Sequence, residues 1–329
     1  MAAGSWNSWT QGDIVTNTKF QDIQDSIVFI YANDSAANSA LTNKVEGTVY
    51  FNTTDDELKF WDGSAWVAIS GAATFTCDFL IVAGGGGGGK GDGAAQGGGG
   101  GAGGYKNSYS TESSGGGGTS ETSFTVVKGL NYTFSVGAGG ALSGGNGGNS
   151  SAFTHLISVG GGFGGYVGGG NREGSAGGSG GGAGSIGSVV FGSNGSGAKL
   201  QGFRGGDYSF SSPFTAGGGG GAGSAGGDAN NTKGNGLASS ITGSSVTRAV
   251  GGNGGLLGGS APSANTGTGG EGRRTSSGNT NGASGIVIIR FATADATITV
   301  GGGLTFSSAT DGSDTVISFT AGTDTVSFS

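Results

Sequence analysis

The distribution of glycine is the feature that most limits what this chain can fold into. The chain has 329 residues with 83 glycines and only two prolines, and 73 of the glycines lie between Gly84 and Gly285. A collagen triple helix needs a strict triplet period and abundant proline, and this sequence has neither. Glycine-rich, weakly charged sequence often stays disordered. Apolar β-branched and aromatic segments recur inside the region, however, so we expect it to fold.

Glycine runs can be ordered if their backbone groups bond to one another. A polyproline II strand repeats every three residues, rises about 3.1 Å per residue and makes no internal hydrogen bonds. Each amide and carbonyl then points sideways and needs a partner on a neighbouring strand. All-glycine strands leave room for such neighbours on every side. Residues 73–293 are therefore predicted to form a glycine-rich domain of β-strands and polyglycine II helices, and the whole chain to be mainly β.

Apolar strands frame and interrupt this domain. It opens with the predicted strand "TFTCDFLIVA" and closes with "SGIVIIRFA". Between them, "TSFTVVKGLNYTFSVGAGG" predicts a hairpin that turns at Lys128-Gly129, and "SAFTHLISVGGG" predicts a further strand. Residues 294–329 repeat a pattern of Asp-Thr-Val followed by Ser-Phe and predict a β-rich C-terminal extension, packed on the main domain or on copies of itself.

Residues 1–72 have ordinary composition and are predicted to form an N-terminal attachment module. Apolar spacings of three and four predict a short helix from about Asn17 to Tyr31, which can act as the seam of a homo-oligomer, with a trimer favoured. Then "GTVYFNTTDDELKFWDGSAWVAIS" alternates and predicts a three-stranded meander with a turn at Asp62-Gly63. The residues expected to attach the chain to its own copies or to neighbouring proteins are Trp6, Trp9, Phe20, Ile23, Ile27 and Ile30.

The stretch "GGGGGGKG" that follows the first framing strand nearly matches a phosphate-binding loop. Gly91 stands where such a loop has its magnesium-binding hydroxyl, and no helix is predicted to follow. One cysteine (Cys77) and one histidine (His155) exclude a Cys/His zinc cluster, and His155 lies in a predicted strand, where a structural role is favoured over a catalytic one. We therefore expect no catalytic residue, cofactor or metal site.

Charge and apolar patterning exclude two classes of partner. The net charge is −7 and no block of like charge resembles a nucleic-acid-binding arm. The apolar runs are too short to span a bilayer, and the opening segment lacks the pattern of a secretion signal. We expect no nucleic-acid partner and no membrane insertion.

Two segments resemble proteins of tailed bacteriophages. The meander "GTVYFNTTDDELKFWDGSAWV" is similar to a module of tail-fibre and structural proteins. The frame "DFLIVAGGGGGG…YTFSVGAGG…GASGIVIIRFA" resembles the glycine-rich domain of tail fibres and receptor-binding tip adhesins. The resemblance implies a virion protein on an external fibre that touches the host surface, with polyglycine II helices and variable aromatic loops at the distal end.

Loops between the glycine runs are the predicted contacts to a host surface glycan or protein. They are 105–114, 191–214 and 271–281, which combine aromatic, small polar and arginine residues, as rigid binding surfaces do. An alternative is that the aromatics close the edge of the glycine packing, and that the chain is a structural spacer or capsid-decorating fibre without a receptor site. A polysaccharide-degrading tail enzyme is the weakest alternative, since no acidic cluster supports it. The receptor-contact candidates are Tyr105, Tyr109, Phe191, Phe203, Arg204, Tyr208, Phe210 and Phe214.

Overall fold

The chain forms two compact units, Met1–Ala73 and Thr74–Ser329, in a computed structural model. It describes residues 29–69, 73–92, 95–166, 172–185, 192–209, 215–255, 261–275 and 280–329. Residues 294–329, which we predicted as an extension, belong to the second unit together with the glycine-rich region. Each unit is described by itself below.

The first unit is a small sheet with one helix. Its strands pair in the order β1-β2-β3-β4, and β1 is parallel to β2 while the other pairs are antiparallel. The predicted meander is confirmed as β2 to β4, and Gly63 in its second turn has a φ of +98°, a conformation that suits glycine. The elements are β1 (Phe29–Tyr31), α2 (Asp34–Ala40), β2 (Val49–Asn52), β3 (Glu57–Trp61) and β4 (Trp66–Ala68).

The helix prediction is wrong in the part of it that the structure describes. Phe29–Tyr31 form β1, and Ile30 is 67% exposed on that strand rather than part of a helical seam. The helix begins instead at Asp34, because the side chain of Asn33 caps it by accepting a hydrogen bond from the Ala36 amide at 3.0 Å. The other predicted attachment residues, Trp6, Trp9, Phe20, Ile23 and Ile27, lie outside the described residues.

Aromatic packing holds the first unit together. Tyr50 and Trp66 are buried against Ala37 of α2, with ring centroids 4.7 Å apart in an edge-to-face arrangement. The indole of Trp66 donates to Asn38 at 3.0 Å, and Trp61 packs on it at 5.4 Å. The tryptophans of the meander therefore serve the core of this unit.

A carboxylate joins the helix of this unit to its sheet. Asp34 accepts hydrogen bonds from the hydroxyl of Tyr50 and from Lys59, the latter at 3.0 Å. The Tyr50 hydroxyl, followed by Lys59, lowers the pKa of Asp34 below its ordinary value of 3.8. Burial and this carboxylate raise the pKa of Tyr50 to about 12.

We predict that Asp34 makes the first unit sensitive to acid. Its pKa is lowered on folding, so its contribution to stability is present above about pH 4 and is lost as the pH falls through the folded pKa. All four tryptophans lie in residues 1–72, so their fluorescence reports unfolding of this unit. The melting temperature of Asp34→Asn should lie below that of the wild type at pH 6, and the gap should close towards pH 2. A gap that stays constant, or an equal gap for the control Asp56→Asn in the exposed turn of the same sheet, would contradict this.

The second unit contains a ten-stranded, nearly closed, barrel-like sheet. Its strands follow the order β10-β9-β8-β16-β13-β5-β6, with β14 and β15 paired to β16 and β7 paired to β5. A separate two-stranded sheet is formed by β11 and β12. The strands are β5 (Thr74–Val82), β6 (Tyr105–Asn107), β7 (Phe124–Val127), β8 (Asn131–Ser135), β9 (Ser150–Ala152), β10 (Leu156–Ser158), β11 (Leu237–Ser239), β12 (Val246–Arg248), β13 (Ile286–Ala292), β14 (Ile298–Val300), β15 (Leu304–Asp311) and β16 (Asp314–Phe328).

The two framing strands are confirmed and lie side by side. β5 and β13 pair antiparallel, from Val82 opposite Ile286 to Asp78 opposite Arg290. Their alternate side chains enter two different buried clusters: Phe79 and Val287 enter one, whereas Leu80 and Ile288 enter the other. Because both faces of the sheet are covered there, Phe79–Val82 and Ile286–Ile289 are apolar without interruption.

The C-terminal segment lies in the middle of this sheet rather than at its margin. The first half of β16 pairs with β13, and its second half pairs with β8. Phe319 and Phe328 of this strand are buried in the larger cluster.

Two local predictions need correction. Lys128-Gly129 joins strands that pair with different neighbours, and "SAFTHLIS" is itself a hairpin of β9 and β10 that turns at Phe153 and Thr154.

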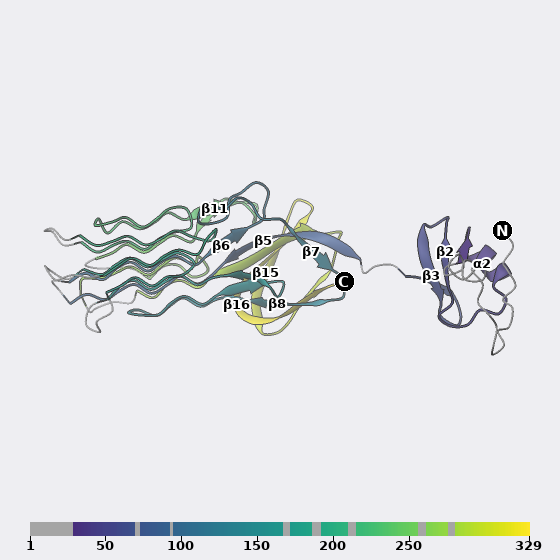
Figure 1. The fold of residues 1–329 in the computed structure, drawn as a ribbon. Coiled ribbons are helices and arrows are strands. Elements are labelled where there is room, and N and C mark those ends of the chain that lie inside the picture. The colour runs from purple at the N-terminus through teal and green to yellow at the C-terminus, as the bar shows by residue number, and fades with distance from the viewer. Residues whose placement is uncertain are drawn as a thin grey trace, which may run out of the picture. The chain divides into compact units, whose positions relative to one another are not determined.

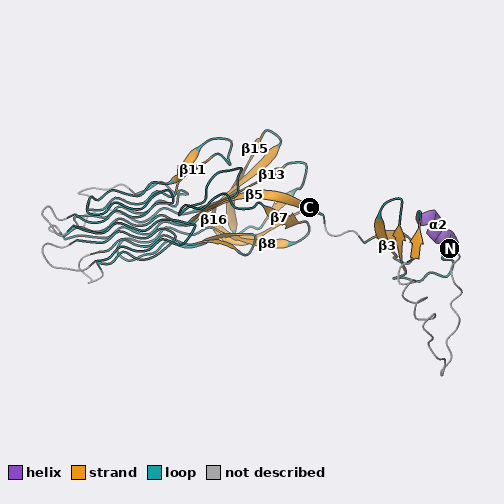
Figure 2. Cartoon of the chain, turned by 45° about the horizontal axis from the view of Figure 1, so that its top comes forward, coloured by secondary structure: helices purple, strands orange, loops and turns teal. Residues whose placement is uncertain are grey.

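The glycine runs form a lattice of backbone hydrogen bonds with a period of three residues. From Gly84 to Gly89, successive amides donate in turn to three neighbouring runs, 145–148, 280–283 and 98–101, and the cycle then repeats. An amide three residues further along this run donates to the same neighbour, but to a carbonyl three residues earlier in it. The run is therefore antiparallel to each of these neighbours. Figure 2 draws these runs as loops extending side by side from the sheet. The donor–acceptor pairs are Gly84–Gly148, Gly85–Ala283, Gly86–Gly101, Gly87–Gly145, Gly88–Thr280 and Gly89–Gly98, at 2.9 to 3.0 Å.

The lattice has no room for side chains in its interior. A Cβ atom added at any position from Gly84 to Gly89 would lie 1.9 to 2.2 Å from a backbone oxygen of a neighbouring run. The same six amides are already bonded to carbonyl groups and do not face outwards to cradle a phosphate. The glycines are thus required by close approach on all sides.

We predict that one methyl group inside the lattice destabilises the second unit. The Gly219 amide donates to Gly252 at 2.9 Å, and a Cβ on Gly219 would lie 1.9 Å from the oxygen of Gly100. Because backbone and not a flexible side chain is in the way, Gly219→Ala should cost about 3 kcal/mol, the upper end of the range for overpacked cores.

A matched control is Gly302→Ala, where a Cβ would meet no atom within 4 Å. Its free energy of unfolding should stay within about 0.5 kcal/mol of the wild type. Urea unfolding of the two variants measures the difference. Equal stability of both would show that run 217–221 is not packed on all sides.

Candidate functional site

The second unit has two ends of different character. At one end β5 begins, and Phe75 there contacts Phe328 near the C-terminus, with ring centroids 5.4 Å apart. The glycine runs leave the sheet at the opposite end (Figure 1). Within the described residues, the far ends of the runs are held together by bonds such as those between Gln96 and Ser185 and from the Arg273 amide to Gly89. We call this region the lattice end.

Two of the predicted contact residues do not form an open aromatic surface. Tyr105 is wrong as a receptor contact, because β6 pairs with β5 and places this side chain in the smaller buried cluster with 0% exposure. Burial raises the pKa of its hydroxyl. Tyr109 is half-buried, and the guanidinium of Arg290 lies over its ring at 5.2 Å. Arg290 is in turn bonded to Asp311 and Asp314, so Tyr109 serves the sheet.

The run 202–209 carries the other described candidates. Phe203 and Tyr208 are half-buried, and the backbone of Phe203 is bonded within the lattice. Arg204 is exposed and forms a two-pronged ion pair with Asp228, at 2.7 and 2.9 Å. The hydrogen bonds of this pair raise the pKa of Arg204 and lower that of Asp228. Phe191, Phe210 and Phe214 lie outside the described residues.

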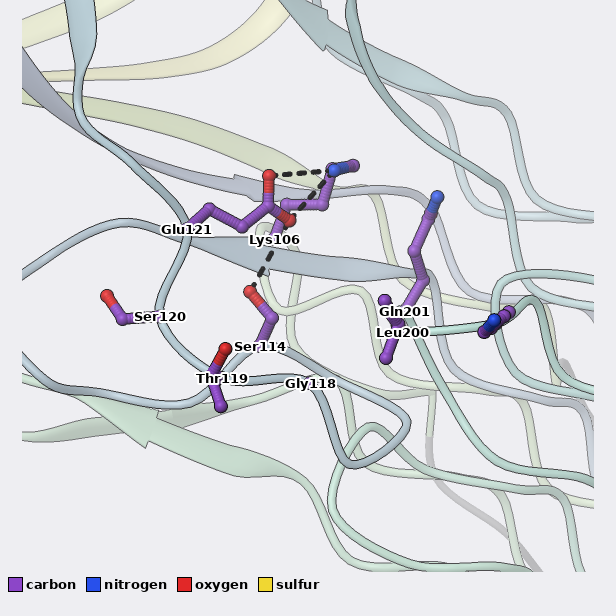
Figure 3. A pocket seen from close by; sticks show the side chains of 9 residues that line it. Lys106, Ser114, Gly118, Thr119, Ser120, Glu121, Leu200 and Gln201 are labelled. Carbon is purple, nitrogen blue, oxygen red and sulfur yellow. Dashed lines mark hydrogen bonds and ion pairs between the residues drawn. The ribbon is translucent and has the colours of Figure 1, made fainter.

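A cavity of about 330 Å³ lies beside β6, where two of the predicted loops meet. Loop 105–114 contributes Lys106 and Ser114, and loop 191–214 contributes Lys199, Leu200 and Gln201. Figure 3 shows the ion pair of Lys106 and Glu121 above Ser114, with Thr119 and Ser120 on one side and Leu200 and Gln201 on the other. The residues that line it are Lys106, Ser114, Gly118, Thr119, Ser120, Glu121, Lys199, Leu200 and Gln201.

Hydrogen bonds fix the polar wall of this cavity. The ammonium of Lys106 lies 2.8 and 2.9 Å from the two carboxylate oxygens of Glu121. Ser114 lies 3.5 Å from the same carboxylate and also accepts from the amide of Asn107 at 2.9 Å. The side chains of Lys106 and Glu121 are 20% and 26% exposed, so a ligand in the cavity could still reach them.

The opposite wall is a strained turn. Leu200 has a φ of +58°, a left-handed conformation that costs a non-glycine residue about 1–2 kcal/mol, and its side chain is 51% exposed. Gln201 anchors the turn: its side-chain oxygen accepts from Val159 at 2.9 Å and its carbonyl from Tyr105 at 3.0 Å. The turn therefore holds an aliphatic side chain at the mouth of the cavity.

The sequence did not predict Glu121, Thr119 and Ser120 as part of a site. They lie outside the three loops that we singled out, and 199–201 reaches them only through the register of the lattice. Loops 105–114 and 191–214 were predicted to contact a receptor. The residues predicted to make the contacts were their aromatic residues and Arg204, and not Lys106 or Lys199.

The cysteine and the histidine are not among the residues that line the cavity. Cys77 is buried, and burial raises its pKa. His155 is exposed and packs against Phe124 at 5.7 Å. Over the described residues, no three His, Cys, Asp or Glu side chains gather in the manner of a metal site.

Membrane-spanning helices were sought in the same residues. None of the helices there has both the length and the hydropathy to cross a bilayer.

Comparison with known proteins places the lattice in a family. A family model described as a glycine-rich domain matches residues 62–292, which is more than half of the chain. The chain belongs to this glycine-rich domain family. No curated protein and no solved structure matches it. The glycine-rich domain of the family spans the lattice, β5, β13 and the cavity beside β6.

Proposed function

We propose that this protein is a virion structural protein of a tailed bacteriophage, a tail fibre or fibre tip that binds a receptor on the host-cell surface. The observation that carries the proposal is the arrangement of the second unit. The start of β5 and the C-terminal residue Ser329 lie at one end of this unit, whereas the glycine runs project towards the opposite, lattice end. Runs that project away from the start of β5 suit a distal contact surface. The resemblance of the meander and of the framed glycine-rich region to tail-fibre modules supports this reading.

The lattice suits such a surface because it is rigid without a thick apolar core. Its amides bond to three neighbours in turn, so the ends of the runs are held in fixed relative positions. Binding residues tend to sit on loops positioned by a rigid scaffold. Several copies of a weak site suffice on a particle, because linked sites bind with a high effective concentration.

We further propose that the glycine runs are polyglycine II helices. The three-residue period of their hydrogen bonds supports this, because a polyproline II strand has three residues per turn and bonds only to its neighbours. The expected φ and ψ are about −75° and +145°. A crystal structure of the second unit should find these angles throughout 84–89 and 97–101, and extended β angles there would contradict the proposal.

The first unit is proposed to attach the chain to other virion proteins or to its own copies, with a trimer favoured. Its described residues expose four large apolar side chains that an interface could cover. They are Ile30, Val45, Val67 and Ile69, at 67%, 69%, 38% and 48% exposure.

A structural spacer or capsid-decorating fibre without a receptor site is the second candidate. It is favoured by the internal use of predicted contact residues: Tyr105 is buried and Arg204 is bonded to Asp228. Under this alternative the aromatics of run 202–214 only close the edge of the lattice.

Adsorption separates the two candidates. We predict that Tyr208→Ala combined with Phe210→Ala weakens receptor binding about 30-fold, since truncating aromatic anchors often costs about 2 kcal/mol or more. Particles with the double variant should assemble but adsorb slowly to host cells. Particles with Phe306→Ala, an aromatic on β15 that is 45% exposed, serve as the control and should adsorb normally. Normal adsorption of the double variant would favour the spacer, and loss of its folding would favour the edge-closing role.

A further inference from the structure

The cavity beside β6 offers a mixture of donors and acceptors. Its lining carries hydroxyls on Ser114, Thr119 and Ser120, an amide on Gln201, and a carboxylate on Glu121. The hydroxyl of Thr119 makes no hydrogen bond to any described residue, and that of Ser120 donates only to the Ser110 carbonyl at 2.9 Å. Such a wall matches a ligand whose own hydroxyls both donate and accept.

The side chains that line the cavity carry a net positive charge. Lys106 and Glu121 neutralise each other within 2.9 Å. Lys199 is exposed and forms no ion pair with any residue that the structure describes. The lining therefore carries one surplus positive charge, which favours a ligand with one anionic group.

The volume of the cavity and the side chains that line it limit the class of ligand that fits. A volume of about 330 Å³ is at the low end for small-molecule sites. Leu200 presents an exposed aliphatic side chain at the rim, which can cover the C–H face of a sugar ring. The lining contains no aromatic residue on which a nucleobase could stack.

We propose that this cavity is a binding site for an acidic saccharide, a sugar that carries a carboxylate. Lys199 binds the carboxylate, the pair of Lys106 and Glu121 with the hydroxyl of Thr119 binds the ring hydroxyls, and Leu200 covers an apolar ring face. This proposal specifies an acidic saccharide as the class of ligand on the host surface. Its biological role rests on the proposed function. Its chemistry can be tested separately.

The direct test is a titration of the full chain with D-glucuronate and with D-glucose. Binding is measured from the chemical shifts of the backbone amides in NMR spectra. Glucuronate should shift the amides of Lys106, Thr119–Glu121 and Lys199–Gln201, and glucose should bind at least tenfold more weakly. Lys199→Gln should weaken glucuronate binding about tenfold, in line with the loss of a charge-assisted hydrogen bond. Thr119→Val should weaken both sugars. The matched control is Lys233→Gln, an exposed lysine on another run, which should bind as the wild type does.

Three outcomes would overturn the site. They are no shift at these amides at the highest soluble glucuronate concentration, equal affinity of Lys199→Gln and the wild type, and equal competition by inorganic phosphate, which would indicate charge alone.

Adsorption of particles tests the biological role separately. If Lys199→Gln slows adsorption and free glucuronate inhibits that of the wild type, the site serves the proposed function. If glucuronate binding is confirmed but the protein is absent from virions, the saccharide site stands and the proposed function fails. If particles adsorb normally with Lys199→Gln and adsorption resists glucuronate, the fibre function stands and this cavity is overturned as its receptor site.

Discussion

The hydrogen bond between neighbouring glycine backbones is the interaction on which the second unit depends. Ordering the backbone of one residue costs about 1–2 kcal/mol, and more for glycine than for any other residue. A single backbone hydrogen bond contributes about 0.5–1.5 kcal/mol net. An isolated glycine run therefore cannot order itself. In the lattice the amides of run 84–89 donate to three neighbouring runs and its carbonyls accept from three others. The backbone hydrogen bonds and dispersion contacts of many such runs together offset the entropy. Folding of the runs is accordingly coupled to folding of the sheet that holds their ends.

That coupling explains why the sheet is built from distant segments. β5 ends where the first glycine run begins, and β13 begins after the last run. These two strands pair directly. β16 then closes the arrangement by pairing with both β13 and β8. Its buried Phe319 and Phe328 fill the cluster between the strands. The strands thus set the relative positions of the runs at one end, and the three-residue bonding propagates this register along the lattice.

Local patterns predicted those parts of the fold that local physics decides. The framing strands, the meander and its Asp62-Gly63 turn follow from apolar runs and turn chemistry. The place of β16 could not be predicted, because its half-polar alternation fits a marginal strand as well as a central one. The helix was misplaced, because Phe29–Tyr31 suit a strand and the capping side chain of Asn33 lies later in the chain. For the candidate site, the two loops could be recognised from the sequence. The burial of Tyr105 and the placement of Lys199 and Glu121 around one cavity depend on lattice register, which irregular glycine spacing does not reveal.

Exclusion of side chains from the lattice also decides where chemistry can lie. Along run 84–89 any Cβ would collide with backbone, so functional groups are confined to turns, outer runs and the strands beneath. The cavity beside β6 lies where one such turn, held by Gln201, meets the loop after β6. Both of its walls are fixed by hydrogen bonds to residues of the strands or the runs. The strained conformation of Leu200 persists because those bonds hold it. A side chain at the mouth of the cavity is thus held in place before any ligand arrives, which reduces the ordering that binding would otherwise require.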